Sequence, residues 1–375
     1  MRTIQVGSLF GIPVLVHPAW FALFALTTLI LATDVYPSTI EGGSPAVHIA
    51  LAAASSVLFF ASIILHELAH SLVARAYRIP VRSITLFLFG GVAQITRDAA
   101  RPTAELLMSL AGPLMSFAVA GACIAGWWAL GGGSSEPQQV MLLWVGAMNG
   151  LLGAFNLLPA FPMDGGRVFR SLLWLITGSY YRASMVAGWT GRLFAWAMMA
   201  LGALALVGYD VWVIDRFGGA WFILVGLFLE GAARQALLYT RLMETLGRYR
   251  AGDLMVPDPP VVDGQMSVGA LARGALELNP RLCYFIEEEG RLAGILGAHQ
   301  MQEVPEPLWD MTPAARAMVP SARLRAANPG QPIADVMVEM ESAGLMHMPV
   351  VTDGRVVGVI SLDRIFGVLR QAGIL

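Results

Sequence analysis

An apolar stretch from Ser55 to Tyr77 contains the sequence HELAH at residues 66–70, and no other feature constrains the chain as strongly. About 20 apolar residues in a row are typical of a membrane-spanning helix. His66 and His70 are four residues apart, so they lie on one face of such a helix with Glu67 beside them. Titratable side chains are costly to place in hydrocarbon, and we therefore interpret this cluster as a functional site.

The composition indicates a membrane protein that also has a water-soluble part. Of the 375 residues, 56% are hydrophobic and 13% are charged, and the mean hydropathy is +0.64. Residues 1–230 contain long runs almost without charge, whereas the last third has an ordinary soluble composition. The net charge of −2 gives no basic surplus, so we expect no direct nucleic acid partner.

Six apolar runs approach the length of a membrane span. They are residues 18–33, 46–77, 103–130, 140–158, about 184–207 and about 220–238. The arginines outside these runs fall almost entirely on one side of the arrangement, and the opposite loops hold only Arg216. Because basic residues favour the cytoplasmic side, we predict a multi-pass protein of the cell membrane with both termini in the cytoplasm. The N-terminus lacks a cleavable signal pattern, so the first run is expected to remain in the protein.

Two segments beside the spans have strand character. Val81–Ile95 is rich in β-branched and aromatic residues and is interrupted by Gly90 and Gly91, which predicts an apolar hairpin. Ile4–Val16 favours a short hairpin or an interfacial segment. The expected fold is a polytopic α-helical membrane protein with six transmembrane helices and a short membrane-associated β-hairpin, followed by an α/β domain.

The soluble part is predicted to be a separate cytoplasmic domain. We place the membrane domain at residues 1–245 and the second domain at 246–375. Two imperfect repeats, about 252–312 and 313–375, each contain a helix-like run and then two apolar strands around a turn. The expected hairpins are residues 282–296 and 347–361.

A catalytic zinc site uses three protein ligands and leaves a fourth position for water, so HELAH must be completed from elsewhere. Asp164 is the carboxylate best placed to do this, in the segment 156–166 at the end of the fourth run. Two prolines and two glycines prevent a continuous helix there, and irregular backbone at membrane depth is tolerated where it lines a cavity. Glu67 would take the proton of a zinc-activated water in peptide hydrolysis.

Each of these residues also has a simpler interpretation. His66 and His70 could form a hydrogen-bonded pair between helices, with Glu67 facing an arginine. Asp164 alone could be a turn residue before two glycines. His17 and His48 lie near span starts, where an imidazole is ordinary, and we do not expect them to bind metal.

The same holds for three residues that could contact a substrate. Asn156 could donate a hydrogen bond to a substrate, or it could satisfy the carbonyls of a helix end. Gly90 and Gly91 could let a strand edge approach an extended substrate, or they could form a tight turn.

The two cysteines, Cys123 and Cys283, are too far apart in sequence to suggest a disulfide framework or a thiolate metal site.

The combination of HELAH in the second of six spans, Phe89-Gly90-Gly91 after it and NLLPAFPMDG at residues 156–165 resembles the site-2 protease family of intramembrane zinc metalloproteases. With its C-terminal pair of CBS-like units, the chain is similar to the bacterial and archaeal branch that includes a sporulation protease acting on a sigma-factor precursor. The resemblance extends over the whole chain. Met163 differs from the usual family sequence, which has leucine before the aspartate.

This resemblance implies one Zn²⁺ per chain, bound by His66, His70 and Asp164, with Glu67 as the catalytic base. Family substrates are membrane-tethered regulators, such as transcription factors, anti-sigma factors or their precursors, which are cut near the cytoplasmic face of the lipid bilayer. The expected activity is therefore regulated intramembrane proteolysis.

The resemblance also implies substrate-binding positions. Asn156 and Pro159 belong to the NLLP motif that helps hold an extended substrate, and Gly90 and Gly91 border the substrate channel. In CBS units, a Ser or Thr after the second strand and a nearby Asp hold an adenine nucleotide.

The usual spacing puts the Asp three residues after the Ser or Thr; in the second copy Ser361 is followed by Asp363, one residue early, and these two residues would bind ATP or AMP. In the first copy the equivalent positions are Gly297 and Gln300, which do not fit this pattern. The pair could instead serve substrate docking or homo-oligomerisation.

Two other classes of function remain compatible with the sequence. The chain could be a CBS-regulated transporter or channel in which the histidines line an ion path. It could also be a catalytically silent family member that only binds membrane partners, although the intact Glu67 argues against this.

Overall fold

The structure, a computed structural model, describes residues 3–40, 43–87, 90–95, 99–133, 136–209, 215–257, 259–278, 284–288, 291–321, 324–353 and 355–374. The chain forms two compact units, Met1–Leu237 and Leu238–Leu375. Phe89, Cys283 and the turn at residues 289–290, all used in the sequence predictions, lie outside the described residues.

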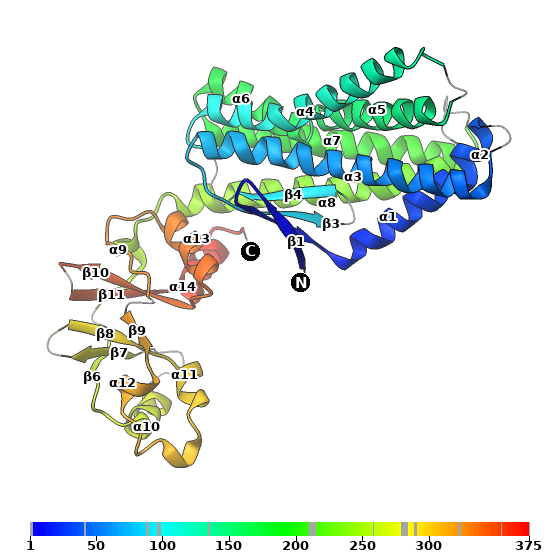
Figure 1. Cartoon of the computed structure of the whole chain (residues 1–375). Coiled ribbons are helices and arrows are strands. Elements are labelled where there is room, and N and C mark those ends of the chain that lie inside the picture. Colours follow the sequence, from blue (N-terminus) through cyan, green and yellow to red (C-terminus); the bar gives the residue numbers. More distant parts are fainter. Residues whose placement is uncertain are drawn as a thin grey trace. The chain divides into compact units, whose positions relative to one another are not determined.

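The first unit is a bundle of long helices beside a small sheet (Figure 1). Its helices are α1 (Pro18–Ile30), a π-helical turn (Leu31–Val35), α2 (Tyr36–Thr39), α3 (Pro45–Ala76), α4 (Pro102–Ala129), α5 (Pro137–Asn156), α6 (Asp164–Thr177), α7 (Tyr180–Val207) and α8 (Arg216–Leu246). Helices α1, α3, α4 and α5 begin with proline, whose missing N–H costs nothing in a first turn. Gly178 ends α6 in the left-handed conformation, with φ of 65°.

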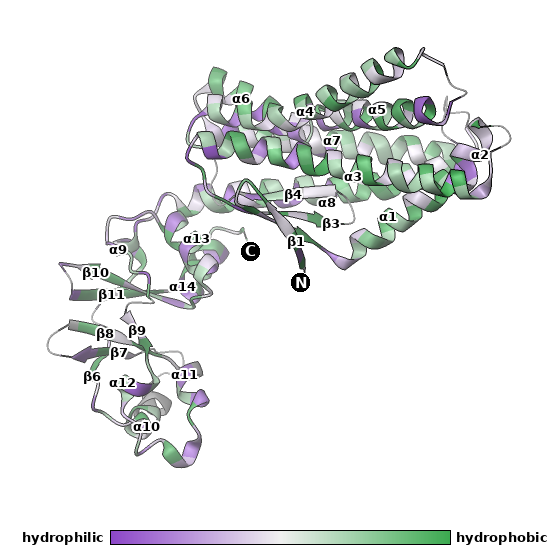
Figure 2. Cartoon of the chain, viewed as in Figure 1, coloured by the Kyte–Doolittle hydropathy of each residue, from purple (hydrophilic) through white to green (hydrophobic). Residues whose placement is uncertain are grey.

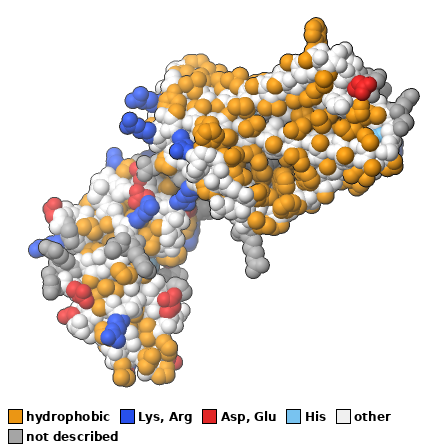
Figure 3. All heavy atoms as spheres, in the orientation of Figure 1, with side chains coloured by type: hydrophobic (Ala, Val, Ile, Leu, Met, Phe, Trp, Pro, Cys, Tyr) orange, Lys and Arg blue, Asp and Glu red, His pale blue; other side chains and the backbone are white. Residues whose placement is uncertain are grey.

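Within the described part of the chain, five helices are long and apolar enough to cross a membrane. They are Pro18–Thr39, Pro45–Ala76, Pro102–Ala129, Tyr180–Val207 and Arg216–Leu246, and Figure 2 shows their hydrophobic character. In Figure 3, hydrophobic side chains cover the visible face of the helical unit, and basic side chains gather at one end of it. The predicted fourth span corresponds to α5, a 20-residue helix that is not among the five, so the count of six spans stays a prediction.

The sheet of the first unit differs from the expectation of separate hairpins. Its strands are β1 (Ile4–Leu9), β2 (Ile12–Val16), β3 (Val81–Phe87) and β4 (Gly90–Ile95), in the order β1-β2-β3-β4. The two antiparallel hairpins are joined by parallel pairing of β2 with β3, in which Val14 faces Ile84. Ile12 and Ile84 pack with Leu68 of α3, so the apolar side chains of both hairpins hold the sheet against the helix that carries HELAH.

The second unit contains two small sheets with helices. Its remaining helices are α9 (Ala251–Leu254), α10 (Val268–Leu278), α11 (Ala298–Glu303), a 3-10 turn (Glu306–Leu308), α12 (Ala314–Ala317), α13 (Ile333–Ala343) and α14 (Leu362–Gln371). Its strands are β5 (Val256–Pro257), β6 (Val261–Asp263), β7 (Tyr284–Glu288), β8 (Arg291–Leu296), β9 (Val319–Pro320), β10 (His347–Thr352) and β11 (Arg355–Ser361). The sheet orders are β6-β7-β8-β9 and β10-β11-β5.

The two repeats exchange their first strands. β5 precedes the first repeat's hairpin but pairs with β11, whereas β9 precedes the second hairpin but pairs with β8. Each repeat has its own buried core, centred on Ile286 and Leu296 in one and on Met348 and Ile360 in the other. The exchange links the two repeats through the backbone as well as through side chains.

Candidate metal centre

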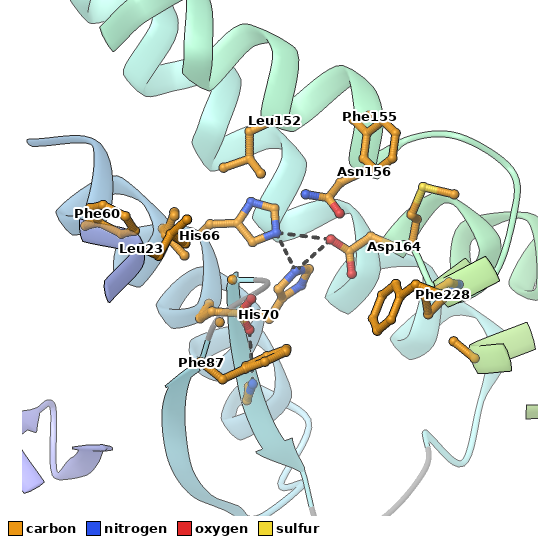
Figure 4. Close-up of a pocket in the computed structure, with 18 of the residues that line it drawn as sticks. Leu23, Phe60, His66, His70, Phe87, Leu152, Phe155, Asn156, Asp164 and Phe228 are labelled. Carbon is orange, nitrogen blue, oxygen red and sulfur yellow. Dashed lines mark hydrogen bonds and ion pairs between the residues drawn. The ribbon is translucent and has the colours of Figure 1, made fainter. Parts of the chain in front are cut away.

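The side chains of His66, His70 and Asp164 converge on one point. Both histidines are buried on the same face of α3, with exposed fractions of 4% and 6%. Asp164 Oδ2 lies 3.1 Å from Nε2 of each histidine, and the two Nε2 atoms are 3.2 Å apart. Figure 4 shows the three side chains pointing toward one another from α3 and from the start of α6. The structure thus brings together residues that are 94 and 98 positions apart.

Helix α4 orients both imidazoles from behind. His70 donates its Nδ1 proton to the carbonyl oxygen of Met108, 2.6 Å away, and His66 Nδ1 shares a hydrogen bond of 2.9 Å with Ser116 Oγ. Such partners fix the ring and direct the other nitrogen toward a metal. With its Nδ1 proton on the Met108 carbonyl, His70 directs Nε2 toward Asp164 and His66.

This donor set fits a divalent cation. A single proton could form a hydrogen bond in only one of the three contacts between these ligand atoms. A cation bound by all three atoms would satisfy all of them at once. Ligand atoms held tetrahedrally at about 2.0 to 2.1 Å from zinc lie about 3.3 Å from each other, close to the observed separations. Two imidazoles and one carboxylate also match catalytic zinc sites, which keep one position open.

Gly112 of α4 lies directly against this point. A Cβ at residue 112 would be 2.5 Å from Nε2 of His66 and closer still to Nε2 of His70. The absence of a side chain at this position therefore leaves the space in which the three ligand atoms meet.

The two glycines after Asp164 have a different role from the helix-breaking one that the sequence suggested. Gly165 and Gly166 are buried in the first turn of α6. A Cβ built on Gly165 would collide with backbone atoms of Leu157, and one built on Gly166 would lie 2.7 Å from backbone atoms of Ala160. The loop after α5 can fold onto α6 only because these positions lack side chains, and this close packing places Asp164 at the metal centre.

Glu67 lies between the metal centre and the sheet. Its Oε2 accepts a hydrogen bond of 3.1 Å from the backbone N–H of Ala93 in β4. A Cβ on Gly91 would lie 2.5 Å from Glu67 Cγ, so the strand approaches the glutamate closely only as glycine. Gly91 thus leaves room for the Glu67 side chain, and the N–H of Ala93 holds its carboxylate beside the two histidines.

A cavity of about 640 Å³ opens onto these groups. Asn156, Gly90 and Gly91 line it, as the sequence predicted for substrate-binding residues, together with Glu67 and the three candidate ligands. Its apolar wall includes Leu23, Phe59, Phe60, Ile63, Phe87, Leu152, Phe155, Phe228 and Leu229, several of which are labelled in Figure 4. Pro159 is exposed and is not among the lining residues.

Three charged residues near this cavity were not predicted from the sequence. Glu105 of α4 is 1% exposed and accepts a hydrogen bond of 2.8 Å from Arg170 Nε of α6. Arg167 Nε lies 3.8 Å from the same Glu105 oxygen, and Arg167 also lines the cavity. The available signal was a carboxylate inside a predicted span, which requires a buried cationic partner.

Ser361, one of the predicted nucleotide residues, makes a local hydrogen bond in the second unit. Ser361 Oγ accepts the backbone N–H of Arg364 and so caps α14, whose first turn contains Asp363. In the first repeat, Gln300 Oε1 accepts the N–H of Gly297 at the start of α11.

Comparison with known proteins defines the class. A model of peptidase family M50 matches residues 54–132 and 134–200, and a CBS domain model matches residues 316–371. The chain is thus a multi-pass membrane metalloprotease with a C-terminal CBS domain.

The relatives identify the family. Protein sll0528 of Synechocystis sp. is 32% identical over 99% of this chain and 96% of its own length. Rip3 of Mycobacterium tuberculosis is 30% identical over 98% of this chain and 94% of its own, and both names include zinc metalloprotease. The structure of the site-2 protease from Methanocaldococcus jannaschii has 29% identity and a TM-score of 0.42 over 63% of this chain and 95% of that one. The chain belongs to peptidase family M50, the site-2 proteases.

Proposed function

We propose that this protein is an intramembrane zinc endopeptidase that cleaves a membrane-tethered regulatory protein in or near its transmembrane segment. The observation that carries the proposal is the convergence of His66, His70 and Asp164 at 3.1 to 3.2 Å, beside Glu67 and at the wall of a cavity. The three ligand residues would hold one Zn²⁺. When bound, zinc polarises a peptide carbonyl and makes water more acidic at neutral pH.

The residues of the chain supply the remaining steps. Glu67, held by the N–H of Ala93, accepts the proton of the attacking water and passes it to the leaving amine. Asn156, which also lines the cavity, donates hydrogen bonds to the backbone of the substrate. The apolar walls exclude bulk water, which strengthens the electrostatic interactions inside.

The substrate would bind in an extended form. A peptide bond in a helix is shielded by the hydrogen bonds of the helix. An edge strand of the protease offers the substrate backbone other hydrogen-bond partners, so the substrate can bind in an extended form. Gly90 and Gly91 of β4 line the cavity and give a substrate backbone room to approach. Transcription factors, anti-sigma factors and their precursors are the expected substrates.

The other parts of this proposal concern topology and regulation. We place the membrane domain at residues 1–245, with six spans and cytoplasmic termini, and the regulatory domain at 246–375. The gathered basic side chains at one end of the helical unit in Figure 3 support that orientation. The CBS pair would modulate cleavage through ATP or AMP at Ser361 and Asp363, or through homo-oligomerisation.

The test separates metal binding from catalysis. Purified Glu67→Gln protein should retain one zinc per chain and lose about 10²- to 10⁴-fold in cleavage rate, the usual contribution of a general base. Glu244→Gln, at an exposed carboxylate, is the control and should cleave normally. Glu67→Gln protein in native membranes should also trap substrates, which are identified by mass spectrometry. Cleavage by zinc-loaded Glu67→Gln protein at the wild-type rate would contradict the role of Glu67.

A further inference from the structure

Arg167 is the cationic side chain of the catalytic cavity. Among the described residues that line the cavity, it is the only arginine or lysine, and its side chain is 26% exposed. It lies three residues after Asp164 in α6, so both side chains lie on one face of the helix.

The neighbouring carboxylate is bonded mainly to another arginine. Glu105 Oε1 accepts hydrogen bonds from Nε and from a terminal nitrogen of Arg170, and the guanidinium of Arg170 also stacks on Phe161 and Tyr180, 5.1 and 4.7 Å from the ring centres. Arg167 Nε is 3.8 Å from the same oxygen, longer than a hydrogen bond. Two guanidiniums therefore share one carboxylate, and the surplus positive charge lies with Arg167 at the cavity.

A guanidinium in a mostly apolar cavity favours an anionic partner. Arginine binds carboxylates through paired hydrogen bonds, and these bonds strengthen where water is excluded. Asp164 and Glu67, the other acidic groups of the lining, are assigned to zinc binding and proton transfer. The complementary carboxylate must then come with the substrate.

The position of Arg167 fixes where that carboxylate lies. Arg167 follows Asp164 by three residues of α6, which is about 4.5 Å along the helix axis at 1.5 Å per residue. An extended substrate advances about 3.3 Å per residue. Arg167 therefore faces a substrate residue one or two positions from the bond that is cleaved.

We propose that Arg167 is a specificity-determining residue that recognises an aspartate or glutamate side chain of the substrate within about two residues of the scissile bond. The inference rests on the proposed protease function and adds a chemical class to its substrate. It predicts that membrane-tethered substrates carry an acidic residue at the cleavage site, although such residues are rare in spans.

The experiment uses full-length protein in phosphatidylcholine vesicles and donor–quencher peptides with one apolar span. The peptides differ at one position, which is Glu, Gln or Lys, and that position is moved along both sides of the cleaved bond. For wild-type protein we expect kcat/KM to be about tenfold higher for Glu than for Gln at one of these positions, mainly through KM, as for a charge-assisted hydrogen bond.

Variants of Arg167 assign the preference. Arg167→Gln should cleave Glu and Gln peptides equally, Arg167→Lys should keep part of the preference, and Arg167→Glu should favour Lys. Zinc content should stay at the wild-type level in all three. Arg182→Gln, at an exposed arginine outside the cavity lining, is the matched control and should keep the wild-type preference.

A binding measurement distinguishes this inference from the proposed function. Peptide affinity is titrated in the Glu67→Gln background, with and without Arg167→Gln, so the Glu-over-Gln ratio is obtained without turnover. Failure of wild-type protein to cleave any peptide overturns the protease function, while this ratio still decides the role of Arg167. The inference is overturned if Arg167→Gln leaves the Glu-over-Gln affinity ratio unchanged. It is also overturned if the effect of Arg167→Gln depends on added phosphatidylglycerol and not on the peptide charge. That second result would identify a lipid headgroup as the partner of Arg167.

Discussion

The metal centre of the first unit and the predicted nucleotide positions of the second use polar side chains in opposite ways. His66, His70 and Asp164 are far apart in sequence, yet their acceptor atoms lie 3.1 to 3.2 Å from one another. Ser361 instead bonds to the backbone of Arg364, three residues away. A single proton can satisfy only one contact among three such atoms, so their convergence fits a bound cation, whereas Ser361 Oγ already accepts a hydrogen bond as a helix cap.

The largest expected effect tests the space at the metal centre. Gly112→Ala should lower zinc affinity by at least about 100-fold and abolish cleavage, because the new methyl group would occupy the place where both Nε2 atoms lie. The imidazoles cannot move away without losing their bonds to Met108 and Ser116. Zinc content measured by atomic absorption after dialysis against a graded chelator checks this.

Gly121→Ala is the matched control for this prediction. Gly121 lies in the same helix, and a Cβ there would have no atom within 4 Å. Its zinc content and activity should remain at wild-type levels. Equal zinc loss in both variants would mean that helix α4 does not tolerate alanine at either position. It would contradict the specific role of Gly112 at the metal centre.

A smaller effect concerns the orientation of His66. Ser116→Ala removes the hydrogen bond to Nδ1 and should weaken zinc binding about tenfold, at the low end for groups that orient a metal ligand. Ser109→Ala, also on α4, removes a buried hydroxyl that has no hydrogen-bond partner among the described residues, and it should leave zinc affinity unchanged. Competition with a fluorescent zinc chelator measures both, and identical affinities for the two variants would contradict the role of Ser116.

The third prediction is made for the second unit. Ser361→Ala should destabilise it by about 1 kcal/mol through the lost helix cap and leave zinc content unchanged. Ser342→Ala, at an exposed hydroxyl near the end of α13, should have a smaller effect. Thermal unfolding and calorimetric titration with ATP or AMP are measured on the same preparations. If Ser361→Ala protein loses nucleotide binding while its stability is unchanged, Ser361 is part of a nucleotide site and not only a helix cap. The contrast with the metal centre would then no longer hold.

The smallest effect is expected at an exposed ion pair of the second unit. The hydrogen bond and the charge of Arg273 hold the pKa of Asp310 below its ordinary value of 3.8. A carboxylate whose pKa is lower in the folded state than in the unfolded state stabilises the fold at pH values above its ordinary pKa. This stabilisation is lost as the pH falls through the pKa of the folded state. Arg273→Ala should therefore lower the unfolding temperature slightly at pH 7 and not at all in strong acid. A difference that persists unchanged in acid would show that the ion pair is not its cause.

The sequence predicted the parts of the site that depend on local geometry. Helical spacing alone places His66 and His70 on one face with Glu67 beside them, and the structure has this arrangement on α3. Asp164 was found through its irregular surroundings and a family resemblance. Its placement as the first residue of α6 was not predicted, because it depends on close backbone packing against Gly165 and Gly166.

Long-range pairing was the main feature that the sequence did not reveal. The parallel contact between β2 and β3 joins segments separated by the whole of α3, and neither strand pattern indicates its partner. The strand exchange between the two repeats was missed for the same reason, since β5 and β9 have two residues each. The place of Arg167 in the cavity was not predicted, because it depends on how Glu105 is shared with Arg170.

Helix α4 provides none of the three ligands, yet it contacts both histidines through Met108, Ser116 and Gly112. Zinc binding and the packing of α3, α4 and α6 are consequently one linked equilibrium. Each tenfold rise in free zinc above the dissociation constant should add about 1.4 kcal/mol to the stability of the packed helices. Zinc occupancy therefore reports the position of α4, and a substitution that displaces this helix would be detected as metal loss while every ligand is intact.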